Sequence, residues 1–198
     1  MTHTEARLDA AEILELARAH AGPDGRLPAP DLAANEIFPF EGQMRVRPLE
    51  QPVLPEPARM GEGGKDCRVC DAPDEAYLWA RGGWRLRTAE PQPLPSFLLE
   101  PREHVDLGDL DERQAAELGV LIVRVERAIA ALPGVGRVHV NRWGDGAEHL
   151  HIWFFARPAG VLQLRGSSLP DWLDVLPPLP PDRTQAIAHA VADALQAG

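Results

Sequence analysis

One long amphipathic helix with strands on both sides of it in the sequence is the feature that most restricts the fold of this chain. Asp111 is followed three residues later by Gln114, the spacing of a capping box, and apolar residues then recur at helical spacing to about Leu132. Pro133 and Gly134 end the pattern. Because strands come first, then a long helix, then more strands, the sequence predicts an α+β fold with this helix packed on an antiparallel sheet.

Short runs of apolar, β-branched and aromatic residues, bounded by turn residues, predict the strands of that sheet. The predicted strands span residues 77–80, 84–87, 96–99, 138–141, 149–155 and 162–164. Gly82 and Gly83 separate the first two runs, which therefore predict a hairpin. Past the last run, residues 177–181 predict an extended proline-rich connector and residues 183–196 a closing amphipathic helix.

The two ends of the chain differ from this central part. Residues 5–20 predict an amphipathic helix, whereas residues 22–65 are rich in proline and glycine and lack sustained periodicity. We therefore expect three parts: an N-terminal helix and irregular arm over residues 1–65, the main domain over residues 66–165, and a C-terminal extension over residues 166–198 that holds the connector and the last helix.

The charge and the hydropathy of the chain exclude some classes of partner. The 198 residues carry a formal net charge of −10, which argues against polymeric nucleic acid as the main partner. The sequence contains no apolar run long enough to cross a bilayer, and its first residues lack the basic start and apolar stretch of a signal peptide. We expect a cytoplasmic protein with no membrane association.

Two histidines in the predicted strand over residues 149–155 are candidates for chemistry. His149 and His151 stand two residues apart, so their imidazoles point to the same face of a strand. Imidazole binds metals such as zinc and serves as a nucleophile or proton carrier near neutral pH. A half-buried strand with two outward polar positions accounts for the pair equally well.

The only two cysteines, Cys67 and Cys70, are too close in sequence to form a disulfide framework. In an intracellular protein such a pair binds metal or performs redox chemistry. No helix whose N-terminus would lower the pKa of a thiol is evident after Cys70, which favours metal.

Several motifs, taken in order, resemble the histidine-triad (HIT-like) superfamily. They are the Cys67–Cys70 pair, a hairpin, Pro101-Arg102-Glu103-His104, a helix with Glu117-Leu118-Gly119, Asn141, and His149-Leu150-His151. The resemblance spans about residues 67–158. It implies a HIT-like antiparallel sheet with a packed long helix. The sequence also resembles the galactose-1-phosphate uridylyltransferase branch of the superfamily. The superfamily contains nucleotidyl hydrolases and transferases that form a covalent nucleotidyl-histidine intermediate.

In the zinc-bearing members of that superfamily, two cysteines and two histidines bind one metal ion. The resemblance places these ligands at Cys67, Cys70, His104 and His149. Because a Cys₂His₂ set fills all four positions of tetrahedral zinc, the expected zinc is structural and does not activate water. It would hold the segment that carries the reactive imidazole.

The same resemblance makes His151 the nucleophile that attacks the α-phosphorus of a nucleoside phosphate ester, anhydride or phosphoramidate. Backbone amides of Gly144 and Gly146 are candidates to stabilise the phosphate, and Asn141 matches an asparagine that contacts the nucleotide in relatives. An asparagine that merely starts the turn is the alternative for Asn141. The expected partner is a nucleotide or nucleotide conjugate, and a homodimer is expected because relatives commonly form one.

Trp153 is the main departure from the pattern, since it replaces the third histidine. An indole offers one N–H donor and no acceptor, so phosphate contact at Trp153 is weakened or rearranged. Arg157 is a candidate to restore positive charge, with a solvated surface arginine as the alternative. A catalytically altered nucleotide-binding or protein-interaction module, which keeps the fold and the zinc, is therefore the second interpretation. Three further tryptophans are candidates to stack on a base, with burial as the alternative: Trp79, Trp84 and Trp172.

Overall fold

The computed structural model describes residues 18–26, 51–89 and 92–197 of the chain. Two compact units are present, Met1–Pro57 and Ala58–Gly198. Most of the expected N-terminal helix and much of the expected arm lie outside the described residues. Residues 18–20 are helical, as expected, and a turn follows in which the Gly22 amide donates to the Arg26 carbonyl at 2.8 Å.

The second unit is built on one five-stranded sheet in which every pair of neighbouring strands is antiparallel. Its strands are β1 (Trp79–Arg81), β2 (Trp84–Thr88), β3 (Ser96–Pro101), β4 (Val135–Asn141) and β5 (Ile152–Pro158). They lie in the order β1-β2-β3-β5-β4, so the strand that follows His151 is the fourth of the five. This arrangement confirms the α+β fold with an antiparallel sheet that the sequence predicts.

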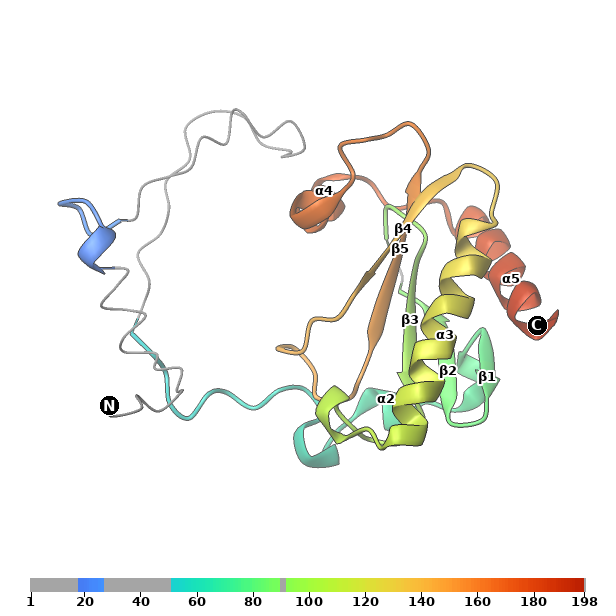
Figure 1. The fold of residues 1–198 in the computed structure, drawn as a ribbon, viewed down its shortest axis with the longest axis horizontal. Coiled ribbons are helices and arrows are strands. Elements are labelled where there is room, and N and C mark those ends of the chain that lie inside the picture. Colours follow the sequence, from blue (N-terminus) through green and yellow to red (C-terminus); the bar gives the residue numbers. More distant parts are fainter. Residues whose placement is uncertain (1–17, 27–50, 90–91, 198) are drawn as a thin grey trace, which may run out of the picture. The chain divides into compact units, whose positions relative to one another are not determined.

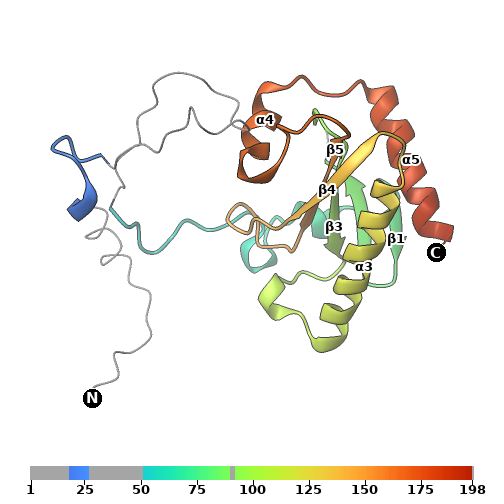
Figure 2. The same ribbon diagram turned by 45° about the horizontal axis from the view of Figure 1, so that its top comes forward.

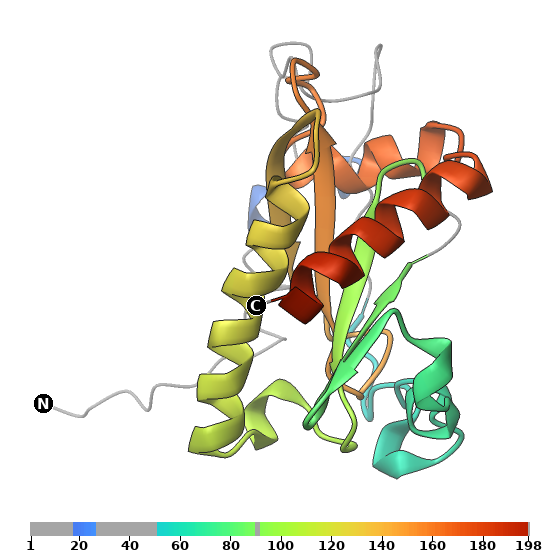
Figure 3. The ribbon, with the colours of Figure 1, turned by 90° about the vertical axis from the view of Figure 1, so that its right-hand side faces the viewer.

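Two long helices cover one face of the sheet (Figures 1 and 3). The helix α3 (Glu112–Ala130) begins with the predicted capping box, in which the Asp111 carboxylate accepts from the Gln114 amide and the Gln114 side chain accepts from the Asp111 amide. The helix α5 (Pro181–Ala197) packs beside it, and the Arg124 guanidinium donates to the Leu195 carbonyl at 2.9 Å. The closing helix therefore belongs to the main hydrophobic core.

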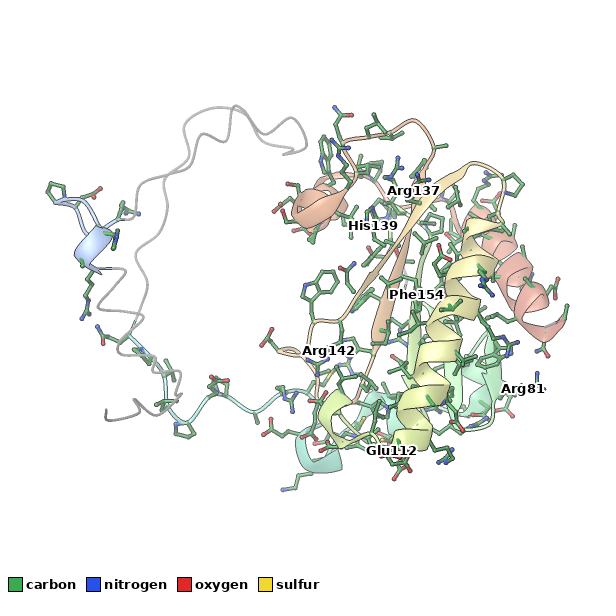
Figure 4. The ribbon with its side chains drawn as sticks, viewed as in Figure 1. Arg81, Glu112, Arg137, His139, Arg142 and Phe154 are labelled. Atoms are coloured by element: carbon green, nitrogen blue, oxygen red, sulfur yellow. The ribbon has the colours of Figure 1, made fainter. Side chains whose placement is uncertain are left out.

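The side chains of β5 alternate between the two faces of the sheet. Ile152 and Phe154 belong to the large core under α3 and α5, and Figure 4 shows Phe154 between the sheet and α3. Trp153 and Phe155 point to the opposite face, where Phe155 packs in a smaller cluster with Leu169 of α4 (Leu169–Val175). In Figure 2, α4 is separated by the sheet from α3 and α5. Burial on both faces explains why this strand reads as an almost continuous apolar run.

Short helices complete the second unit. They are α2 (Arg68–Asp71) and the 3₁₀ helices η2 (Glu62–Gly64), η3 (Asp74–Ala76), η4 (Leu107–Asp109) and η5 (Gly166–Ser168). None of the helices in the described ranges combines the length and the apolar character needed to cross a membrane.

Three local expectations differ from the structure. The strand expected over 149–155 begins only at Ile152, because the Leu150 amide bonds to the Val105 carbonyl of a loop. Residues 162–164 form no strand, since Leu164 packs under α4 from a loop. The helix α4 was not expected, because seven residues are too few to display helical periodicity.

Candidate metal centre and active site

Four potential metal ligands converge at one end of the sheet. Cys67 and Cys70 lie at the start of α2 and within it, His104 lies in the turn after β3, and His149 lies before β5. Their ligand atoms are all within 4.8 Å of one another. The Sγ atoms of Cys67 and Cys70 are 3.4 and 3.5 Å from Nδ1 of His149, and the Cys70 Sγ is 3.4 Å from Nδ1 of His104. The four residues implied by the resemblance therefore form one cluster.

The geometry and chemistry of this cluster fit zinc. Tetrahedral zinc with Zn–S bonds of about 2.3 Å and Zn–N bonds of about 2.0 Å places sulfur and nitrogen about 3.5 Å apart. The three sulfur–nitrogen distances agree with that spacing. The sequence-based argument against a redox pair considered only the residues after Cys70, whereas the short helix α2 begins directly after Cys67. Two imidazole nitrogens aimed at the two sulfurs nevertheless favour a metal site.

The unbound thiols differ in acidity. Burial raises the pKa of Cys70 to about 11, and the hydrogen bond with Cys67 adds to this effect. Burial also opposes ionisation of Cys67, but hydrogen bonds from the backbone and side chain of Cys70 outweigh it and lower the Cys67 pKa. A metal ion that binds both sulfurs has to displace the proton of Cys70.

Both histidines of the cluster have their second ring nitrogen fixed by a hydrogen bond. Nε2 of His149 donates to the Pro101 carbonyl at 2.9 Å, and burial lowers the pKa of His149, which favours the neutral ring. Nε2 of His104 lies 2.8 Å from the carboxylate of Glu148. In each ring Nδ1 is left to face the sulfurs, as metal-binding histidines require.

Glu148 connects the cluster to a segment that we call the strap, residues 59–64. Its carboxylate accepts from the Gly63 amide at 2.7 Å and lies 3.4 Å from the Arg59 guanidinium. The Arg59 guanidinium also binds the Asp106 carboxylate at 2.7 Å. Met60 adds two backbone bonds, donating to the Gly146 carbonyl and accepting from the Glu148 amide, both at 3.1 Å. The strap therefore fastens the loop that leads into His149.

His151 lies beside this cluster and is half-buried. Nδ1 of its ring donates to the carbonyl of His149 at 2.9 Å, so Nδ1 carries the proton and Nε2 keeps its lone pair. Leu150, between the two histidines, is buried in the core under α3. The alternation that the sequence implies is thus kept although these residues precede the strand.

Asn141 and Trp153 lie on the same side of the sheet as His151. They are directly paired between β4 and β5, and paired residues of antiparallel strands share a face. The Trp153 and His151 ring centroids are 6.4 Å apart with the planes at 83°. The indole of Trp153 therefore occupies the third position of the triad, next to the candidate nucleophile.

The remaining predicted residues have mixed placements. Gly144 and Gly146 belong to the loop bound by the strap, where the Gly144 carbonyl accepts from Arg59 at 3.1 Å. Arg157 is buried and is not a solvated surface arginine, because its guanidinium donates to the carbonyls of Pro158 and Val161. These contacts give Arg157 a structural role at the far end of β5. Trp79 and Trp84 are buried in the main core, in agreement with the burial alternative.

Sequence reasoning missed three residues of this region. Arg59 lies in a stretch without periodicity and Trp143 in a turn, so no spacing pattern marks either of them. His139 is paired with Phe155 and lies on the His151 face, and its buried Nε2 has no hydrogen-bond partner among the described residues. An isolated histidine in a strand gives no sequence signal of this kind.

Comparison with solved structures identifies the fold. A histidine triad protein from Bradyrhizobium japonicum is 23% identical, with a TM-score of 0.51 over 60% of this chain and 88% of that chain. A histidine triad protein from Sinorhizobium meliloti 1021 is 17% identical, with a TM-score of 0.52 over 60% of this chain and 87% of that chain. Protein-family models and curated proteins gave no match. The fold of this chain is that of the histidine-triad proteins.

Proposed function

We propose that this protein is a nucleotidyl hydrolase or transferase that forms a covalent nucleotidyl intermediate on His151. The substrate class is a nucleoside phosphate ester, anhydride or phosphoramidate. The hydrogen bond from Nδ1 of His151 to the His149 carbonyl supports the proposal most directly, because it leaves the lone pair of Nε2 available for attack.

The reaction proceeds in two steps, transfer of the nucleotidyl group to His151 and its transfer to an acceptor. In the first, Nε2 of His151 forms a bond to the α-phosphorus, and the bond from phosphorus to the leaving group breaks with its electron pair on the leaving group. In the second, water or another acceptor attacks the same phosphorus, loses its proton and releases the imidazole. The side chain of Asn141, on the same face, and the amides of Gly144 and Gly146 are suited to bind the phosphoryl oxygens.

The four-ligand cluster would hold a structural zinc ion in this scheme. Zinc bound by Cys67, Cys70, His104 and His149 has no open position for substrate. Its contribution is to fix His149, whose carbonyl orients the imidazole of His151. The chemistry remains with the imidazole.

Mass spectrometry of the intact protein tests this proposal. Incubation with a panel of nucleoside phosphoramidates, dinucleoside polyphosphates and nucleotide sugars, followed by a rapid quench, should add the mass of one nucleotidyl group, which is that of a nucleoside monophosphate less one water. The adduct should be absent from His151→Ala, whereas His189→Ala, which replaces a histidine on α5, should still form it. A panel without adduct or turnover would rule against the enzyme.

A nucleotide-binding or protein-interaction module without turnover is the second candidate. It is favoured by Trp153, because an indole cannot exchange a proton with a leaving group as the imidazole of a full triad can. The module would bind nucleotides with the native affinity in His151→Ala and form no adduct in either protein. The two candidates therefore give opposite results in the same experiment.

A homodimer is the expected assembly. Val120 and Val123 of α3 are 60% and 44% exposed, and Val140 of β4, the last strand in the sheet order, is 38% exposed. An apolar helix surface beside an end strand suits a symmetric contact. Light scattering should give twice the chain mass, and Val140→Lys should reduce it to that of one chain.

A further inference from the structure

A pocket of about 290 Å³ opens on the same face of the sheet as His151. It is lined by Gln92, Trp143, Trp153, Phe155, Pro170, Leu173 and Asp174. The residues come from the loop before β3, the loop after β4, the strand β5 and the helix α4. Neither the metal cluster nor the proposed reaction at His151 accounts for this pocket.

Three aromatic rings form one side of the pocket. Trp153 and Phe155 are stacked, with centroids 5.3 Å apart and planes at 4°. The ring of Trp143 stands edge-on to both, at 6.3 Å from Trp153 and 6.1 Å from Phe155. Phe155 is buried, but Trp143 is 43% exposed, so part of an indole surface is open beside the pocket.

We propose that this pocket is a subsite for a planar aromatic ring of the substrate whose phosphorus reacts at His151. The inference rests on the proposed function for the link to His151, but the binding of the ring does not depend on turnover. The volume is at the lower end of the range for small-molecule sites, which suits one ring system. Stacking on tryptophan is the interaction that the walls offer.

Two polar side chains define which ring fits best. Asp174 is exposed on α4 and, when ionised, only accepts hydrogen bonds, whereas the amide of Gln92 both donates and accepts. A ring that bears an amino or ring N–H group satisfies Asp174. The chemical class is therefore a heteroaromatic ring with at least one donor on its edge.

The position of Trp153 limits how this ring is connected to phosphorus. Its centroid is 6.4 Å from the imidazole of His151, so the pocket begins directly beside the attacking group. A nucleobase reaches it through one ribose, and an aromatic leaving group reaches it from the phosphorus itself. Both sources present the same chemistry to the tryptophans, and an experiment has to distinguish them.

Equilibrium binding to the full-length native protein makes this distinction without any reaction. Adenosine 5′-monophosphate compared with ribose 5-phosphate gives the contribution of a nucleobase, and phenylphosphonate compared with methylphosphonate gives that of a ring in the leaving-group position. In Trp143→Ala one of these two contributions should fall about tenfold or more, while the ligand without a ring keeps its affinity. The pair that responds identifies the source of the ring.

Three further proteins complete the test. Trp143→Phe keeps an aromatic surface and should retain most of the ring contribution. His189→Ala, on α5 at the helix-covered side of the sheet, should change nothing. If a nucleobase occupies the pocket, Asp174→Asn should remove the preference for adenosine 5′-monophosphate over the analogue without the amino group. If an aromatic leaving group occupies it, Asp174→Asn should remove the preference for aminophenylphosphonate over phenylphosphonate. Circular dichroism verifies that each variant is folded.

Two results would overturn the subsite: a ring that adds nothing to affinity in the native protein, or ring contributions that survive in Trp143→Ala. Failure of the proposed reaction is recognised separately. In that case the ring contributions depend on Trp143 as expected, but no adduct forms on His151.

Discussion

Nε2 of His104 and the carboxylate of Glu148 lie 2.8 Å apart, which makes Glu148 the outer partner of a candidate metal ligand. The same carboxylate accepts the amide of Gly63 in the strap. Acidic partners of this kind orient a metal-binding imidazole and strengthen its bond to the metal. The residue before His149 thereby acquires a role that its neighbourhood in the sequence does not suggest.

Replacement of Glu148 should weaken zinc binding. We expect a loss of about 10- to 100-fold in affinity for Glu148→Ala and a smaller loss for Glu148→Gln, which keeps an acceptor oxygen. Competition with a chromophoric chelator measures the affinity, and the absorption bands of the cobalt-substituted protein report the geometry of the site. Glu112→Gln, at the start of α3 (Figure 4), is the matched control and should bind zinc as the native protein does. Equal affinities in all four proteins would remove Glu148 from the metal site.

Zinc should be present at about one equivalent per chain and should stabilise the fold. Because metal binding to a site absent from the unfolded chain adds to folding stability, a strong chelator should lower the Tm by about 10 °C for a loss on the order of 3 kcal/mol. The measurement is a thermal melt with and without chelator, together with metal analysis. The double variant Cys67→Ser with Cys70→Ser should have the Tm of the chelator-treated native protein, and the chelator should not change that Tm further. A native protein without zinc and with an unchanged melt would contradict the site.

Glu117 should make part of the stability dependent on pH. Its carboxylate accepts from Nε1 of Trp84 at 3.0 Å and from Arg113 at 2.7 Å, and these bonds hold its pKa below the ordinary value of 4.5. Because the pKa is lowered in the folded state, the stabilisation is complete above about pH 4.5 and is lost as the pH falls through the lowered pKa.

Denaturant unfolding of the native protein and of Glu117→Gln at several pH values tests this dependence. The native protein should be more stable at pH 7, and the difference in the free energy of unfolding should shrink below about pH 4.5. Asp111, which is near Arg113 and caps the same helix, is retained in both proteins. A difference that stays constant down to pH 3 would show that the carboxylate charge is not involved.

Trp153 should make turnover sensitive to the leaving group. An indole supplies no proton to a departing group, and general acid catalysis is worth about 10²- to 10⁴-fold. Nucleotidyl substrates with weakly basic leaving groups, such as 4-nitrophenol, should therefore react much faster than those with alkylamines. In Trp153→His the difference in kcat/KM should narrow, whereas Trp153→Phe should preserve it. Equal rates for both leaving groups in the native protein would show that another residue supplies the proton.

Patterns of local spacing predicted the framework well. The capping box at Asp111 and Gln114 set the start of α3, and the alternation around Leu150 put that residue in the core and His151 beside Trp153. The metal cluster followed from the order of the motifs, because each ligand is weak evidence by itself. The capping box and the alternation depend on residues close together in the sequence. The metal cluster depends on the order of motifs in a known family.

Contacts between distant segments could not be predicted in this way. Arg59 meets Asp106 and Glu148 across intervals of 47 and 89 residues, and no periodicity links the three. The predicted start of the strand at His149 was wrong because the Leu150 amide donates a hydrogen bond to the carbonyl of Val105, which lies in a loop. Trp143 joins the aromatic pocket only because the loop after β4 folds over β5.

The strap has a practical consequence for shortened forms of this protein. A chain that started at Cys67 would still possess every sulfur and imidazole of the cluster, yet the carboxylate of Glu148 would lose the Gly63 amide, and the Gly146 carbonyl would lose that of Met60. A shortened protein that begins at Cys67 would thus lack the hydrogen bonds that hold the loop before His149 in place. One that begins before Ala58 would keep them.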